Sequence, residues 1–305
     1  MNKKVAVLFP AFGMGYKVSF PSYQDEYKRL LSLASQVVKI EERHFEKIAN
    51  GIIEDDLQAH YFCYIQSCLI SQILKKEKVP CDYVAPYSMG LFASLFYVSS
   101  LSFEEGLLLM DHTCRSALAS VDKDKQYGMG AIIGLTIETV QELLLQDFFN
   151  IEVADISNEH VILISGIAQE IQRLLSIATE KGALQCKMLP IALPYHSRFI
   201  QNAQQRIQAY VEKLEIKPPL YPLISSIHQN FLTTPQEIKK ELGENISHSI
   251  NWLMTMNKLI ASGVSVFCEC GASDSLVKLL RFIKGDFESY HPRNFDKLFR
   301  LFKES

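Results

Sequence analysis

The stretch Asp-Tyr-Val-Ala-Pro-Tyr-Ser-Met-Gly at residues 82–90 constrains the fold of this chain more than any other stretch. Residues 83–85 have the apolar character of a buried strand, and the small and apolar run 91–98 is typical of a helix that packs on a sheet. Ser88 therefore falls on the sharp turn between them, which holds its side chain above the sheet and points the first helical amides at whatever that side chain attacks. The usual pattern at such a turn is Gly-x-Ser-x-Gly, and Pro86 takes the place of the first glycine. An ordinary surface serine ahead of a helix is the alternative interpretation.

The hydrophobic pattern predicts a parallel α/β sheet around this turn. A buried helix at 57–77 precedes the strand at 83–85, because its apolar residues recur at helical spacing. Strand, helix, strand, turn and helix in that order are typical of a parallel sheet covered by helices. The other strands that we expect in this part are 5–9, 221–226 and 264–270, and the other helices are 21–48, 103–119, 202–214, 234–242, 251–261 and 276–283.

A compact block with a different rhythm follows the polar link at 122–126. Its pattern predicts strand, helix, strand, strand, helix and strand, which is the order of a ferredoxin-like unit. The expected strands are 129–135, 151–155, 160–165 and 184–189, and the expected helices are 138–146 and 168–181. We therefore expect a hydrolase-like large α/β domain at 1–125 and 194–305, with a ferredoxin-like small subdomain inserted at 126–193.

The composition argues against several kinds of partner. The 305 residues are 48% hydrophobic with a net charge of -3, which is typical of a soluble globular protein, and no long basic tract suggests nucleic acid. No segment reaches the length of a membrane span, and the run 5–9 is too short for a secretion signal. Seven cysteines, an odd number, predict a reducing cytoplasm rather than a disulfide framework. Cys268 and Cys270 share one face of an expected strand, which favours burial over a metal site.

A serine nucleophile needs a base within hydrogen-bond reach, and eight histidines compete for that role. His196 is the strongest candidate, because it follows an apolar, proline-containing junction where the inserted block rejoins the large domain. Such junctions face the cleft between domains. A structural histidine with satisfied hydrogen bonds is the alternative. Asp155 is the only tempting acid between Ser88 and His196, and its place in a strand of the insert favours a structural role.

Six short motifs extend the pattern around Ser88 and His196 to the whole chain. They are Phe-Pro-Ala-Phe-Gly-Met-Gly at 9–15, Pro-Tyr-Ser-Met-Gly-Leu at 86–91, Ser-Gly at 165–166, Leu-Pro-Tyr-His-Ser at 193–197, the stretch 245–252 that ends in tryptophan, and Gly-Ala-Ser-Asp-Ser-Leu at 271–276. In this order and spacing they resemble the malonyl-CoA:acyl-carrier-protein transacylase family, which includes stand-alone acyltransferases of polyketide synthases and related acyl hydrolases.

The resemblance implies a two-step acyl transfer. Ser88 would attack a thioester after His196 takes its proton, and the backbone amides of Phe12 and Met89 would hold the oxyanion. The backbone carbonyl of Asn245 would orient the histidine, so that no acidic residue is required. A phosphopantetheine thiol would then take the acyl group from the serine. The donor would be an acyl-CoA or carrier-protein thioester and the partner an acyl carrier protein, with no metal and no permanently bound cofactor.

Two departures from that family's malonyl-selective pattern concern the substrate pocket. The carboxylate-binding arginine of malonyl-selective members falls on Thr113, and Arg115 lies two positions further, about 200° around the helix. A charge-assisted carboxylate contact contributes on the order of 1.5–3 kcal/mol, so malonyl selectivity is not expected. The segment that contains Tyr195 also differs from the motifs that accompany malonyl and methylmalonyl selection. We therefore expect Thr113, Tyr87 and Tyr195 to line a less polar pocket.

The residues leave three functions open. One is transfer of an uncharged or unusual acyl group to an acyl carrier protein in polyketide or fatty-acid-type biosynthesis. Another is hydrolysis of stalled acyl groups, because family relatives that do this tend to lack the carboxylate-binding arginine. A third is a catalytically silent docking protein, which the retention of Ser88 and His196 argues against. Candidates for contacts with phosphates or an acidic carrier protein are Arg198, Lys278, Arg281 and Lys284, of which the last three also fit a solvated helix face.

Overall fold

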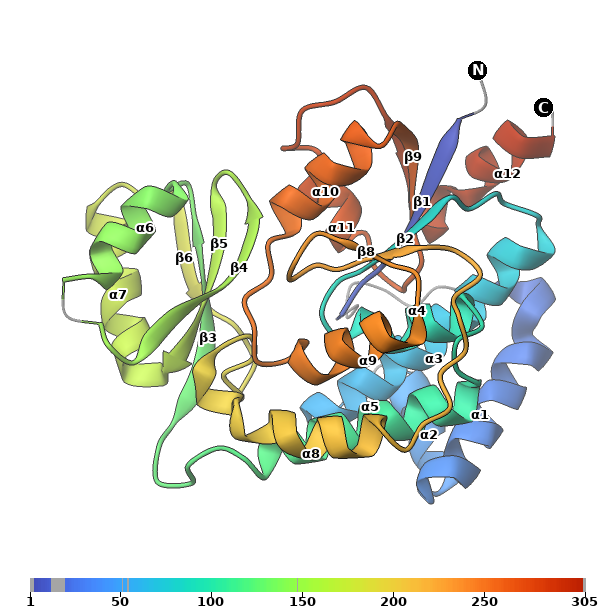
Figure 1. Ribbon diagram of the computed structural model, residues 1–305, viewed down its shortest axis with the longest axis horizontal. Helices are drawn as coiled ribbons and strands as arrows, with labels where there is room; N and C mark the ends of the chain where they lie inside the picture. The colour runs from blue at the N-terminus through green and yellow to red at the C-terminus, as the bar shows by residue number, and fades with distance from the viewer. Residues whose placement is uncertain (1–2, 12–19, 51, 54, 147, 304–305) are drawn as a thin grey trace.

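The larger of two sheets carries the predicted serine turn near its centre (Figure 1). The computed structural model describes residues 3–11, 20–50, 52–53, 55–146 and 148–303. The strand order is β10-β9-β1-β2-β7-β8, and every neighbouring pair is parallel except β7 and β8. The strands are β1 (Lys4–Phe9), β2 (Tyr83–Pro86), β7 (Leu223–Ile224), β8 (Phe231–Leu232), β9 (Val264–Glu269) and β10 (Glu288–Tyr290).

Helices cover both faces of this sheet, as the apolar character of its strands requires. On β1, Val5, Val7 and Phe9 pack into the larger core, while Ala6 and Leu8 pack into a separate core on the opposite face. The helices whose buried residues belong to the larger core are α1 (Gln24–Val38), α2 (Glu42–Ala49), α3 (Asp56–Lys76), α4 (Gly90–Tyr97), α5 (Phe103–Leu118), α8 (Asn202–Val211), α9 (Pro235–Glu244) and α12 (Phe295–Lys303). The opposite face is covered by α10 (Trp252–Ala261) and α11 (Ser275–Leu280).

The inserted block forms the second sheet, which is antiparallel and has the order β4-β5-β3-β6. Its strands are β3 (Tyr127–Ile133), β4 (Ile151–Asn158), β5 (Val161–Ile167) and β6 (Gln185–Met188), and its helices are α6 (Ile137–Leu144) and α7 (Ala168–Glu180). This order is that of a ferredoxin-like unit, so the predicted fold class is confirmed. The domain boundaries at 125/126 and 193/194 stay predictions.

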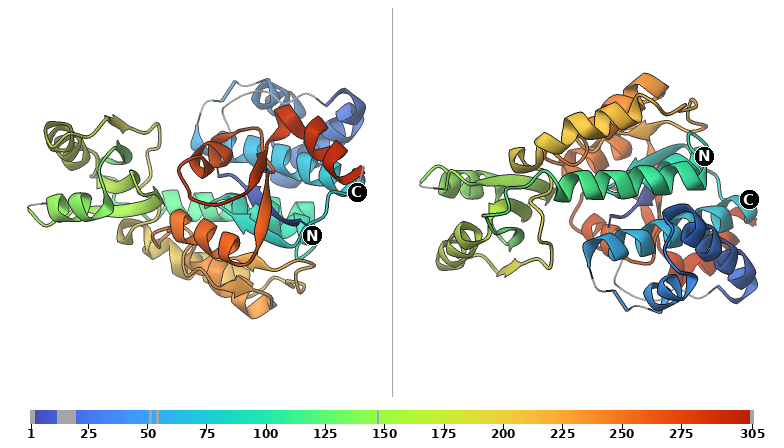
Figure 2. Two further views of the ribbon diagram at one scale, coloured as in Figure 1. Left: turned by 90° about the horizontal axis from the view of Figure 1, so that it is seen from above. Right: turned by 90° about the horizontal axis from the view of Figure 1, so that it is seen from below.

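The small sheet lies at one end of the molecule, opposite α12 (Figure 2). Both of its helices contribute to a core on one face, with buried residues such as Val140 and Ile171. Its other face turns toward the large domain, because Met129 and Ala154 belong to the larger core. The two domains therefore share a continuous buried interface.

Several boundaries differ from the sequence-based expectation. The single helix expected at 21–48 is a short 3-10 turn followed by α1 and α2, and the break lies at Lys39, whose φ of 56° is left-handed. The short edge strands β8 and β10 and the helix α12 were not expected. Two- and three-residue strands carry too little periodicity to be recognised from sequence. In the described ranges, no helix combines the length and hydrophobicity that crossing a membrane requires.

Candidate active site

Ser88 lies on the sharp turn between β2 and α4, as the sequence predicts. Its φ of 53° is in the left-handed region, which is uncommon for a residue other than glycine and marks a strained turn. The N–H of Tyr87 donates to the carbonyl of Phe9 at 2.9 Å, which fixes the turn against the end of β1. A Cβ at Gly90 would collide with that same carbonyl, so glycine allows α4 to begin directly against β1.

His196 reaches this turn from the loop that follows β6. Its φ is 61°, and its N–H donates to the carbonyl of Ile246 at 2.6 Å. The hydroxyl of Ser197 donates to the carbonyl of Pro194 at 2.6 Å, which closes the loop on itself. The position of the imidazole is therefore set by a segment far along the chain as well as by its own loop.

The two predicted catalytic side chains are in contact. The distance from Ser88 Oγ to His196 Nε2 is 2.7 Å, although the residues are 108 positions apart. The other ring nitrogen, Nδ1, lies 3.1 Å from the carbonyl oxygen of His248, which can only accept a hydrogen bond. Nδ1 must therefore carry the proton, and Nε2 is free to accept the hydroxyl proton of the serine.

Asn245 lies at the same place but contributes in more than the expected way. The acceptor that lies 3.1 Å from Nδ1 of His196 is the carbonyl of His248, and the backbone of Asn245 is near enough to raise the pKa of His196. In addition, its side-chain amide donates to the carbonyl of Ser88 at 3.2 Å. Asn245 thus touches both members of the pair, and His248 is a partner that the sequence did not indicate.

Burial sets the protonation state of the base. Ser88 and His196 are 7% and 5% exposed, respectively. Burial lowers the pKa of His196 to about 4, and the hydrogen bonds to the backbones of His248 and Asn245 oppose this only in part. The imidazole is therefore neutral near pH 7, which is the state that a general base requires.

One of the two predicted oxyanion donors can be placed. Met89 is the N-cap of α4, and the amides that follow it donate to carbonyls of the turn, with the N–H of Gly90 2.9 Å from the carbonyl of Tyr87. The N–H of Met89 follows directly on the nucleophile, so it is positioned to bind an oxyanion formed at Ser88. Phe12, the other predicted donor, lies outside the described residues. The roles of both amides stay predictions.

A narrow cavity of about 10 Å³ lies directly behind the turn, with roughly the room that one water needs. Residues from four segments line it, among them Pro10 after β1, Met89 and Gly90 at the turn, His60 and Cys63 from α3, and Met110 from α5. Burial lowers the pKa of His60 to about 4, so this histidine is also neutral near pH 7. None of the described lining residues therefore carries a positive charge.

The three residues expected in the substrate pocket do not line this cavity. Thr113 is fully buried on α5, and within the described part of the chain its hydroxyl has no hydrogen-bond partner. The ring of Tyr195 is buried beside His60, with the centroids 6.2 Å apart. The hydroxyl of Tyr87 instead donates to Asp155 at 2.8 Å. The contact of these residues with substrate stays a prediction.

Arg115 does not take the place of the missing arginine. Its side chain is 60% exposed, and its Nε lies 2.9 Å from Oδ2 of Asp111 on the same helix. The hydroxyl of Tyr61 also contacts Asp111, so the guanidinium is part of a surface cluster. This agrees with the expected rotation of about 200° away from Thr113.

His60 and Met110 are site residues that the sequence did not single out. The signal that could have found them is a stripe on α3, because His60, Cys63, Tyr64 and Ser67 are spaced as one face of a helix and all line the cavity. A helix buried on most sides hides such a stripe, since most of its other positions are apolar as well. Among the described residues, no group of three or more His, Cys, Asp or Glu side chains could hold a metal ion.

Comparisons with known proteins place this geometry in context. No family model matches the chain. The polyketide biosynthesis protein ThaF of Burkholderia thailandensis is 32% identical over 202 residues, which are 66% of this chain but only 17% of that protein. The polyketide biosynthesis malonyl CoA-acyl carrier protein transacylase PksC of Bacillus subtilis is 25% identical over 289 residues, 93% of this chain and 99% of that protein.

The fold comparison covers the same length. The acyl-carrier-protein S-malonyltransferase of Burkholderia pseudomallei superposes with a TM-score of 0.88, covering 98% of this chain and 99% of that chain at 21% identity. Its fold is thus shared from end to end, including the inserted small sheet. A stand-alone transacylase matches over nearly its whole length, and the Ser88–His196 contact lies where the shared motifs predict it. In sequence and in fold, the chain is therefore similar over nearly its whole length to malonyl CoA-acyl carrier protein transacylases.

Proposed function

We propose that this protein is a serine-dependent acyltransferase that moves an uncharged acyl group from a CoA or carrier-protein thioester to an acyl carrier protein, without malonyl selectivity. The observation that carries the proposal is the buried 2.7 Å contact between Ser88 Oγ and a neutral His196. Such a pair is the minimum that an acyl-serine mechanism needs. The name of PksC, a malonyl CoA-acyl carrier protein transacylase, supports the carrier protein as partner. A cytoplasmic location is part of the proposal.

The reaction proceeds in two steps. Ser88 Oγ attacks the thioester carbonyl while His196 Nε2 takes its proton, and the amide of Met89 stabilises the oxyanion. The thiolate leaves as a thiol with the proton from Nε2. The phosphopantetheine thiol of a carrier protein then attacks acyl-Ser88, with His196 again acting as the base, and the serine is regenerated. No permanently bound cofactor takes part.

The absence of a cation near the described part of the site supports an uncharged acyl group. Thr113 takes the place of the arginine that malonyl-selective relatives carry, and Arg115 is engaged with Asp111 at the surface. Burying an ionised carboxylate without a partner costs several kcal/mol. The cavity behind Met89 has room for about one water, so every acyl chain requires side chains there to move, and a short chain requires the smallest movement.

Intact-mass spectrometry tests the proposed activity. The protein is incubated with acetyl-, propionyl-, butyryl-, hexanoyl- and malonyl-CoA, and the mass of each covalent adduct is recorded over time. We expect adducts from the short uncharged donors, formed faster than with hexanoyl-CoA and absent in Ser88→Ala. Adding a holo carrier protein should move the acyl group onto its thiol. Release as free acid would identify a hydrolase instead, and the lack of any adduct would identify a silent docking protein.

The selectivity argument has its own test. We expect Thr113→Arg to increase malonyl loading by about 10–100-fold, the equivalent of a charge-assisted contact of about 1.5–3 kcal/mol. The matched control is Arg115→Gln, which removes a surface cation and should leave loading of every donor within about twofold, because exposed ion pairs contribute little. Efficient malonyl loading by the unmodified protein would contradict the proposal.

A further inference from the structure

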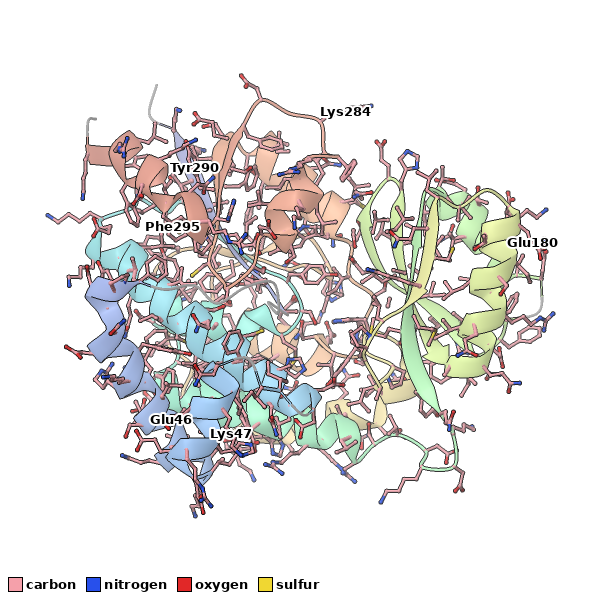
Figure 3. The ribbon with its side chains drawn as sticks, turned by 180° about the vertical axis from the view of Figure 1, so that it is seen from behind. Glu46, Lys47, Glu180, Lys284, Tyr290 and Phe295 are labelled. Carbon is pink, nitrogen blue, oxygen red and sulfur yellow. The ribbon has the colours of Figure 1, made fainter. Side chains whose placement is uncertain are left out.

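One strand of the small sheet, β4, touches the segments that carry both members of the catalytic pair. β4 is an edge strand, and its pairing with β5 shifts register between Val153 and Asp155, which leaves Ala154 as an extra, bulged residue. β-Bulges bend a strand and re-aim its side chains, and they are frequent beside active sites. In Figure 1, β4 lies on the side of the small sheet that faces the large domain, and in Figure 3 Glu180 marks the outer end of the small subdomain.

The free edge of β4 binds the segment that orients His196. The N–H of Ile250 donates to the carbonyl of the bulged Ala154 at 2.9 Å, and the N–H of Ile156 donates to the carbonyl of Ile250 at 3.0 Å. Ile250 lies two residues after His248, whose carbonyl accepts the Nδ1 proton of His196. The partner of the base is therefore attached directly to the small sheet.

The same strand also binds the loop of His196 itself. Glu152 accepts a hydrogen bond from the N–H of Arg198 at 2.8 Å and forms an ion pair with its guanidinium group. Arg198 lies two residues after His196. Thus β4 holds the histidine from two directions, through its loop and through its hydrogen-bond acceptor.

Asp155 connects this strand to the nucleophile. Its Oδ2 accepts the hydroxyl hydrogen of Tyr87 at 2.8 Å, and Tyr87 is the residue immediately before Ser88. The ring of Tyr87 packs edge-on against Trp252 at the start of α10, with the centroids 5.2 Å apart, and α10 lies beside β4. The backbone next to the nucleophile is thereby fixed by a side chain that reaches across the domain interface.

Burying the carboxyl group of Asp155 costs free energy of desolvation, which a purely structural interface would avoid. It is 1% exposed, and among the ion pairs of the described residues none includes it. Hydrogen bonds from Tyr87, Ser157 and the backbone of Trp252 are what compensate its burial, while Oδ1 has no partner among the described residues. An apolar residue would fill the same space with less desolvation cost. A directional contact to the residue before Ser88 explains why a carboxyl group is there.

We propose that Asp155 is a positioning residue, which acts through the hydroxyl of Tyr87 to hold Ser88 at hydrogen-bond distance from His196. The inference rests on the proposed roles of Ser88 and His196. Because β4 binds both the histidine segments and, through Asp155, the nucleophile turn, one rigid strand fixes the distance between them. Misplacing reacting groups by about 1 Å costs on the order of 10²-fold in rate.

The test uses p-nitrophenyl acetate, because this ester acylates a reactive serine without any CoA or carrier-protein contact. Ser88 Oγ bonds to the acetyl carbon, His196 Nε2 takes the serine proton, and p-nitrophenolate leaves, so the burst of colour measures acylation. We expect Tyr87→Phe to lower the acylation rate constant by about 10–100-fold with KM within about twofold. The matched control, Tyr83→Phe on the same strand, should remain within twofold of the unmodified protein.

Variants of Asp155 distinguish positioning from general stability. Asp155→Asn keeps an acceptor for the Tyr87 hydroxyl and should retain more activity than Asp155→Leu, which should match Tyr87→Phe. The double variant Tyr87→Phe/Asp155→Leu should be no slower than the slower single variant, since both remove one contact. Multiplied losses in the double variant, or an unchanged rate in Tyr87→Phe, would overturn the proposal.

Thermal melts of each variant identify any that fail to fold. If Asp155→Leu does not fold, Tyr87→Phe alone tests the positioning role, because it removes a single oxygen atom and keeps the ring. A burst that depends on Ser88 without transfer from any thioester would contradict the proposed function and leave the positioning result standing. The lack of any Ser88-dependent burst in the unmodified protein would overturn both.

Discussion

The turn that carries Ser88 and the loop that carries His196 achieve the same result by different means. Both residues have a positive φ, 53° and 61°, and both side chains are buried. The serine turn is built from consecutive residues of β2 and α4, packed against the end of β1. The histidine loop depends on the segment around His248 and on β4 of the small sheet. The nucleophile is thus set mainly by local sequence, and the base by contacts distant in the chain.

The largest effect should come from removing either member of the pair. We expect Ser88→Ala to abolish the acyl adduct and His196→Ala to slow its formation by about 10²–10⁴-fold, the usual contribution of a general base. Because the two groups act as a unit, the double variant should lose no more than Ser88→Ala. Adduct formation is followed by intact mass. Full activity in His196→Ala would break the comparison, since the distant segment would then have no role in catalysis.

An intermediate effect should come from the local half of the comparison. Gly90→Ala places a Cβ against the carbonyl of Phe9, which is backbone and cannot move aside, so we expect a loss of about 1–3 kcal/mol in the free energy of unfolding and slower acylation. Gly243→Ala is the control, because its Cβ would meet only the end of the flexible Gln208 side chain. Urea denaturation measures both variants. Equal stability of the two would show that the turn does not need a close approach to β1.

The smallest effect should be a shift of the pH profile of acylation. It tests the His196 loop, whose position depends on segments distant in the chain. The pKa of His196 in the folded protein is lowered to about 4, so acylation should persist at pH 5 and be lost as pH falls through about 4. An ordinary histidine would lose activity near pH 6.5. The measurement is the rate of adduct formation between pH 4 and 8. An acid limb near 6.5 would show that the base is solvated when it acts.

The lowered pKa of His196 should also make the folded protein less stable as the pH falls. Because the folded pKa of His196 is below the unfolded one, the unfolded chain binds more protons between pH 4 and 6.5, and the stability contribution of the neutral histidine is lost as pH falls through that window. His60 is lowered to about 4 by burial and acts in the same direction. Circular dichroism at each pH separates this unfolding from loss of the base.

Much of the fold and the centre of the site could be predicted because they depend on patterns between residues close together in the sequence. The alternation of apolar residues in β1 and the small residues of α4 identify strand and helix directly. The break between α1 and α2 could not be predicted in this way, because Lys39 takes a left-handed conformation that its residue type does not favour. The same limit applies to the edge strands, which form only because a neighbour offers free backbone groups.

The details of the site were harder to predict than its centre. Asn245 was expected to supply the carbonyl that orients His196, but the carbonyl 3.1 Å from Nδ1 is that of His248, and the side-chain amide of Asn245 donates to the carbonyl of Ser88. Asp155 was expected to be structural, and the direction of its side chain depends on a bulge that no sequence pattern marks. Backbone carbonyls have no residue signature, so their roles become visible only when the chain is folded.

The sequence alone determined where the nucleophile lies, which histidine could serve it, and that a small antiparallel unit interrupts a larger parallel sheet. These follow from spacing along the chain, which short-range sterics and hydrophobic periodicity convert into strands, turns and helices. Only the tertiary structure decided the 2.7 Å contact, the burial that keeps His196 neutral, and the link from β4 to Tyr87. Distances and desolvation depend on which segments meet in space, and residues 108 positions apart meet only through packing of the whole chain.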